Sequence, residues 1–110
     1  MENEISKIKS KVKKILIKHN ATRAGIFGSY VRGEQKKNSD VDILVELSSE
    51  LDLIDIIIIK NELERNIGKK VDLVEYECIR KELRENILKE EVRIIWKETT
   101  NYIYKISEKA

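Results

Sequence analysis

The chain has 110 residues, a length that supports one modest hydrophobic core and leaves no room for a separate substrate domain. Hydrophobic residues make up 41% and charged residues 38%, a globular composition that excludes a disordered chain. The 22 basic and 20 acidic residues nearly cancel, so we expect no autonomous binding to nucleic acid and no electrostatic attraction to a membrane.

The cellular location is predicted from segments that the sequence lacks. Cys78 is the single cysteine, so no disulfide can form within the chain. Residues 1–10 carry charges throughout and do not resemble a signal peptide. The longest apolar run, 56–59, is far too short to cross a bilayer. We therefore expect a cytoplasmic protein.

The first predicted elements lead into a tight turn. Apolar residues at helical spacing, with lysines between them, predict an amphipathic helix over residues 3–19. Residues 22–27 are typical of a strand. That strand runs into Gly28-Ser29, which we expect to turn the chain and to open a short helix over 29–33.

A polar loop over residues 34–39 precedes the clearest strand, which we predict over 41–47. Its side chains alternate between two faces. One face carries Val41, Ile43, Val45 and Leu47, and the other carries Asp42, Leu44 and Glu46. This strand therefore has one wholly apolar face and one face on which acids flank a leucine.

The segment 50–67 is ambiguous, because its run of four isoleucines would also suit a strand. Ser49 and Asp52 resemble an N-terminal cap, the apolar residues have helical spacing, and Gly68 can end a helix. We therefore predict a helix here, followed by a third strand over 71–75.

Residues 79–90 are predicted to form a helix, and 92–96 either a short fourth strand or the continuation of that helix. Residues 1–98 are expected to form one domain and 99–110 a C-terminal tail. The order of elements predicts an α/β (α+β) fold in which helices flank a small mixed sheet.

Acidic residues on two of the predicted strands indicate a metal site. Asp40 and Asp42 are two positions apart, so their side chains point to one face. Such neighbours repel, and each raises the pKa of the other unless a cation lies between them. Magnesium takes ligands of this kind together with substrate phosphates. If the two strands are neighbours, Asp72 joins the pair, and three carboxylates can hold two metal ions.

The turn before the polar loop is suited to bind phosphate. Gly28 allows a backbone conformation that a side chain would obstruct. Ser29 then opens a helix, where free N–H groups favour an anion. A Gly-Ser pair alone is common in ordinary turns. Its combination with Asp42, an acid at the start of a largely apolar strand, favours a nucleotide site, because burying an unpaired carboxylate is costly.

Two segments together resemble a known signature: Gly-Ser-Tyr-Val-Arg-Gly-Glu at 28–34 and Asn-Ser-Asp-Val-Asp-Ile-Leu-Val at 38–45. Ten residues separate the Gly-Ser pair from the Asp-Val-Asp triplet, as in the DNA polymerase β-like nucleotidyltransferases. Over residues 3–97 the chain resembles the minimal nucleotidyltransferase (MNT) family, the antitoxin partners of HEPN toxins. Asp72 stands where that family carries its third carboxylate.

The resemblance implies a role for each of these residues. Asp40 and Asp42 would bind Mg²⁺ that carries ATP, and Asp72 would complete a second metal site and help to deprotonate the attacking hydroxyl. Gly28 and Ser29 would hold the β- and γ-phosphates. A sixth residue, Arg32, would contact phosphate, with a purely structural role as the alternative.

The resemblance also implies an acceptor: AMP would pass from ATP to a tyrosine of a partner HEPN toxin, which it inactivates. Trp96, Tyr102 and Tyr104 are candidates for the partner interface, with core closure by Trp96 and a frayed tail as the alternative. The competing hypothesis for the whole chain is a non-catalytic antitoxin that neutralises its partner by complex formation alone. Transfer to a small molecule or an RNA end is disfavoured, because it would need an additional acceptor domain.

Overall fold

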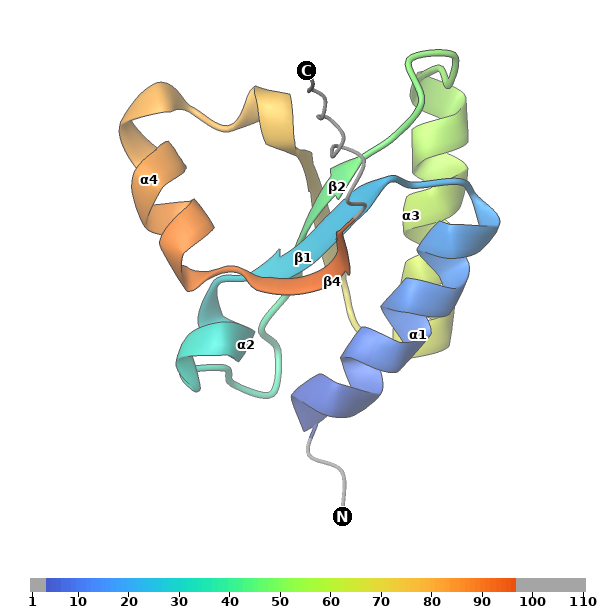
Figure 1. Cartoon of the computed structure of the whole chain (residues 1–110). Helices are drawn as coiled ribbons and strands as arrows, with labels where there is room; N and C mark the ends of the chain where they lie inside the picture. Colours follow the sequence, from blue (N-terminus) through green and yellow to red (C-terminus); the bar gives the residue numbers. More distant parts are fainter. Residues whose placement is uncertain (1–3, 97–110) are drawn as a thin grey trace.

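The computed structural model of the chain describes residues 4–96, which form a four-stranded sheet flanked by helices (Figure 1). In chain order the elements are α1 (Glu4–Lys18), β1 (Arg23–Phe27), α2 (Ser29–Arg32), β2 (Val41–Glu46), α3 (Leu53–Ile67), β3 (Val71–Glu75), the 3-10 helix η1 (Tyr76–Cys78), α4 (Lys81–Glu90) and β4 (Val92–Trp96). The predicted tail 99–110, with Tyr102 and Tyr104, lies outside the described residues.

The sheet is mixed, as predicted, with the strand order β3-β2-β1-β4. The pairs β1–β2 and β1–β4 are antiparallel, and β2–β3 is parallel. The parallel pair requires a crossover, which α3 supplies. As a result β2 lies in the interior of the sheet, between β1 and β3, and the first residues of β2 and β3 lie side by side.

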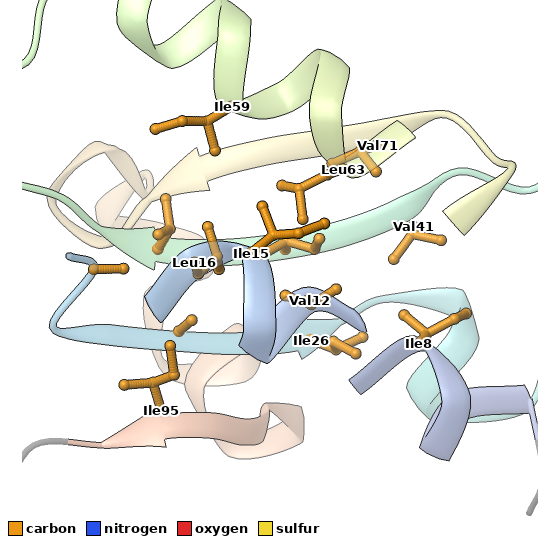
Figure 2. Close-up of a cluster of buried hydrophobic side chains, with 14 of the residues drawn as sticks. Ile8, Val12, Ile15, Leu16, Ile26, Val41, Ile59, Leu63, Val71 and Ile95 are labelled. Carbon is orange, nitrogen blue, oxygen red and sulfur yellow. The ribbon is translucent and has the colours of Figure 1, made fainter. Parts of the chain in front are cut away.

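Helices α1 and α3 cover one face of the sheet and enclose the main hydrophobic core (Figure 2). The largest fully buried side chains in this core come from both helices and from the strands: Val12, Leu16, Ile26, Val41, Ile43, Val45, Ile59 and Leu63. The apolar face predicted for β2 is therefore confirmed. On the far side of α3, Ile58 and its apolar neighbours remain exposed.

The other face of the sheet is covered by α4, with α2 next to it (Figure 1). A small second cluster of Leu44, Tyr76 and Ile79 is buried here, and no residue of α4 itself is buried. Ile79 caps the end of η1 in an extended conformation, and α4 begins only at Lys81, so Ile79 lies outside the helix that was predicted over 79–90. The polar face predicted for β2 points to this side.

The two ambiguous segments have definite structures. The isoleucine run belongs to α3, whose first turn is held by a reciprocal capping box between Asp52 and Asp55. Gly68 ends this helix in the left-handed conformation, with φ 78°. Residues 92–96 form a strand, because they pair with β1 along the edge of the sheet. No helix among residues 4–96 is long and apolar enough to cross a membrane.

Candidate active site

The turn between β1 and α2 brings Gly28 against the carboxyl group of Asp42. Gly28 has φ 83°, a conformation that disfavours residues with a side chain, and a Cβ atom here would overlap with Asp42 Oδ2. The cause is the sheet register, which pairs Phe27 directly with Asp42. Glycine is therefore required both by the turn and by the close approach of this carboxylate.

The parallel pairing of β2 with β3 brings the acidic residues together. Asp42 and Asp72 are register partners, and Asp40 precedes β2 by one residue. Burial, together with the negative charges of Asp72 and Asp40, raises the pKa of Asp42 to about 6, while Arg32 opposes the shift. The electrostatic conflict expected from the spacing of the aspartates is therefore present in the folded chain.

The donor set fits a hard divalent cation by its chemistry. Within residues 4–96, no three His, Cys, Asp or Glu side chains form a group that could hold a metal ion unaided. Magnesium seldom needs such a cage, because one or two carboxylates and the phosphates of a substrate complete its shell. The raised pKa of Asp42 reflects in part its repulsion by Asp40 and Asp72. A cation bound beside these carboxylates would offset that repulsion.

The groups predicted to bind phosphate at the start of α2, the Gly28 amide and Arg32, already have hydrogen-bond partners. The Val31 and Arg32 amides donate to the Gly28 carbonyl at 3.0 and 3.1 Å and form the first turn of the helix. The Gly28 amide donates to Glu90 Oε2 at 2.6 Å. The Arg32 guanidinium donates to Glu34 at 2.8 Å and to both Glu90 oxygens at 3.1 Å, and these contacts raise the pKa of Arg32.

A groove of about 400 Å³ opens beside Asp40, between the loop before β2 and the loop before β3. Lys37, Lys69 and Lys70 line it together with the aspartate. These lysines place positive charge next to the acidic cluster. A second groove, of about 310 Å³, lies on the α4 side toward the far end of β2, around Glu46, and contains none of the predicted site residues.

The structure brings five of the six predicted site residues into one place at the end of the sheet: Gly28, Arg32, Asp40, Asp42 and Asp72. The sixth, Ser29, opens α2 directly after Gly28. Glu90 was missed by the sequence reasoning, because 62 positions separate it from Gly28 and it is one of several glutamates on α4.

Core closure by Trp96, the alternative to a place in a partner interface, is wrong. Its side chain is 40% exposed, and the guanidinium groups of Arg23 and Arg93 lie over its ring at 4.5 and 3.8 Å. Arg23 also stacks on Tyr76, at 3.9 Å from the ring centre. Trp96 therefore belongs to a surface cluster of aromatic rings and arginines at the end of β4.

Two relatives share much of this sequence. A Methanocaldococcus jannaschii protein named as a candidate protein adenylyltransferase is 47% identical over 91 residues, which cover 83% of this chain and 98% of the relative. A Thermococcus cleftensis protein named protein adenylyltransferase MntA is 39% identical over 70 residues, or 64% of this chain and 71% of the relative.

Two solved structures share the fold. A toxin–antitoxin complex with AMP-PNP has a chain that superposes with a TM-score of 0.72 at 24% identity, over 90% of this chain and 82% of that one. A chain in the complex of a tri-AMPylated Shewanella oneidensis HEPN toxin with an MNT antitoxin superposes with a TM-score of 0.67 at 19% identity. The match covers 93% of this chain and 81% of that one.

The family model described as polymerase beta, nucleotidyltransferase matches residues 10–100. That span includes the Gly28 turn and all three aspartates of the site. The resemblance to the minimal nucleotidyltransferases is confirmed by these matches and by the fold. The chain belongs to the polymerase β nucleotidyltransferase family.

Proposed function

We propose that this chain transfers AMP from ATP to a tyrosine hydroxyl of a partner HEPN toxin and so acts as its antitoxin. The observation that carries the proposal is the placement of Asp42 between the Gly28 turn and its register partner Asp72. Support comes from relatives named protein adenylyltransferases and from a similar fold bound to an AMPylated HEPN toxin.

In this proposal, Gly28, Ser29 and Arg32 hold the phosphates of ATP through backbone amides, a hydroxyl and a guanidinium group. Asp40 and Asp42 hold Mg²⁺, with Asp72 as the third carboxylate of a two-ion site. When bound, Mg²⁺ neutralises the charge that develops on the phosphates and draws the acids together. The chain's own contribution is to fix the acids on adjacent strands, so that little rearrangement is needed when the nucleotide arrives.

The transfer step uses the exposed side of the site. Asp72 is solvent-exposed and lies on the edge strand β3, where a hydroxyl of another protein can approach it. The tyrosine oxygen attacks the α-phosphorus of ATP, a new P–O bond forms, and the bond to the β-phosphate oxygen breaks. Pyrophosphate leaves, and the phenolic proton passes to the carboxylate of Asp72. The enzyme is predicted to act in the cytoplasm.

The test is transfer of label. Purified protein is incubated with α-³²P-labelled ATP, Mg²⁺ and a candidate HEPN partner protein, and mass spectrometry then locates the added AMP. We expect AMP on a tyrosine of the partner, and chelation of Mg²⁺ should stop the reaction. The double variant Asp40→Ala, Asp42→Ala should lower the rate at least about a hundredfold while the protein stays folded.

Three outcomes would contradict parts of the proposal. Undiminished transfer by the double variant would remove both aspartates from the metal site. Label on a side chain other than tyrosine would correct the acceptor. A double variant that transfers nothing and still neutralises the partner at equal dose would favour the non-catalytic antitoxin, which acts by complex formation alone.

A further inference from the structure

The carboxylate of Glu90 lies in the position where the proposed site would receive a phosphate. Glu90 is the last residue of α4, and its Oε2 accepts the hydrogen bond of the Gly28 amide at 2.6 Å. Both of its oxygens accept from Arg32 Nη1 at 3.1 Å. An anion thus already engages two of the groups that the proposed function gives to the nucleotide.

The position of Glu90 at the end of α4 is unfavourable for the stability of that helix. A carboxylate in the last turn of a helix lies at the negative end of the helix dipole and is disfavoured there. The negative charge of Glu90 also contributes to raising the pKa of Asp42, so the two carboxylates repel each other. The favourable contacts that hold it in place are those with Gly28 and Arg32.

We propose that Glu90 is an internal stand-in for phosphate, which holds the Gly28 amide and Arg32 in the nucleotide-free protein and must leave when ATP binds. This inference rests on the proposed nucleotide site and adds an element of regulation to it. ATP would then compete with a side chain of the same protein, and its apparent affinity falls with the fraction of molecules in which Glu90 is seated.

Displacement of Glu90 requires little rearrangement of the protein. No residue of α4 is buried, and the Glu90 side chain is itself 25% exposed. The next residue, Glu91, accepts a hydrogen bond from the Tyr76 hydroxyl, which anchors the chain before β4. The carboxylate of Glu90 can therefore swing away while the sheet stays intact.

The experiment measures binding of a non-hydrolysable ATP analogue with Mg²⁺ by calorimetry, in the absence of any partner. Glu90→Gln removes the charge and Glu90→Ala also removes the acceptor. Both should bind the analogue about tenfold more tightly than wild type, as expected if Glu90 is seated in about nine molecules of ten. Circular dichroism confirms that each variant folds.

Two variants serve as matched controls. Glu91→Gln removes the same negative charge at the next residue, whose side chain bonds to Tyr76 and not to Gly28. This variant therefore reports the general electrostatic effect of losing one carboxylate on nucleotide binding. Glu34→Gln frees Arg32 from its other carboxylate and leaves the Gly28 amide engaged. Each should change the affinity by less than about threefold, because Glu91 bonds to Tyr76 and not to Gly28 or Arg32, and the exposed ion pair of Arg32 with Glu34 contributes little.

The proposal is overturned if both Glu90 variants bind the analogue no more tightly than wild type, or if Glu91→Gln has the same effect as Glu90→Gln. A loss of affinity in the Glu90 variants would overturn it too, since Glu90 would then position Arg32 for the nucleotide. Binding is measured without transfer, so a protein that shows the predicted affinities and labels no partner contradicts only the proposed function.

Discussion

On one face of the sheet, α1 and α3 press closely packed isoleucines, leucines and valines against the strands, and the side chains at the centre of that layer are fully buried. On the other face, α4 buries none of its residues, and acids and arginines line a groove beside a small apolar cluster. Strand β2 contributes to both faces, with Val41 and Ile43 on the first and Asp42 on the second.

The difference shows how so small a domain can tolerate a destabilising site. Asp42 is partly buried against like charges, which lowers stability, and its neighbour Ile43 is fully buried in the main core. The unfavourable energy of one face is offset by the burial of apolar area on the other. The four predictions that follow test whether the two faces can be altered separately.

The largest effect on stability is expected from Leu63→Ala. Leu63 is fully buried between α3 and the sheet, so its truncation leaves a cavity and should lower the free energy of unfolding by about 3 kcal/mol. Chemical denaturation measures the change. Ile58→Ala, on the exposed side of the same helix, is the control and should change stability by less than about 0.5 kcal/mol. Equal losses in the two variants would show that the packed layer does not carry the stability.

On the opposite face, Gly28→Ala should lower AMP transfer about a hundredfold, or about 2.7 kcal/mol in the barrier. The new methyl group would overlap with the Asp42 carboxylate, and alanine is strained at φ 83°. Initial rates of label transfer measure the loss. Gly33→Ala, which has a similar φ of 74° and open space around it, separates strain from overlap. Similar losses in the two variants would contradict the contact with Asp42.

The third prediction concerns pH and the metal-free protein. Because the folded pKa of Asp42 is raised to about 6 from 3.8, the folded chain keeps this proton when the unfolded chain has lost it. The free energy of unfolding should therefore fall as pH rises from about 4 to about 6.5. After allowance for partial exposure, the fall is on the order of 1–2 kcal/mol.

Asp42→Asn should remove that pH dependence, become more stable than wild type at pH 7, and lose transfer activity. Denaturation at a series of pH values, with and without Mg²⁺, provides the measurement. A wild-type curve that stays flat between pH 4 and 6.5 would show that the acidic cluster carries no such strain.

The smallest effect is expected from Asp52→Ala at the start of α3. The Asp52 side chain accepts a hydrogen bond from the Asp55 amide at 2.9 Å, and its loss should cost about 1 kcal/mol of stability. Nucleotide affinity should be unchanged, since this cap is remote from Gly28. Altered affinity in a variant that remains folded would reveal coupling between the two faces.

Patterns that are local in the chain were predictable from the sequence. Alternation along β2 fixed the face of Asp42, and the Gly28 turn followed from glycine before a helix-opening serine. Residues 92–96 could not be assigned, because a five-residue segment with four apolar residues fits either a helix or a strand, and only pairing with β1 decides between them.

Contacts between segments that are far apart in the chain could not be predicted from the sequence. The bond from Gly28 to Glu90 joins α2 to the end of α4, and no spacing rule relates those positions. Gly25 is a similar case, because the Glu91 side chain fills the place that its Cβ would occupy. The predicted site therefore contained the acids and the turn, and lacked the residue that occupies it in the absence of a nucleotide.

The parallel pairing of β2 with β3 has a consequence for how the sequence can vary in length. Asp72 faces Asp42 because the Val41 amide donates to the Lys70 carbonyl at 2.8 Å, which fixes where β3 begins. One residue inserted or deleted between Gly68 and Lys70 would shift β3 by one position and turn Asp72 to the opposite face. We expect this short connection to tolerate substitutions far better than changes of length.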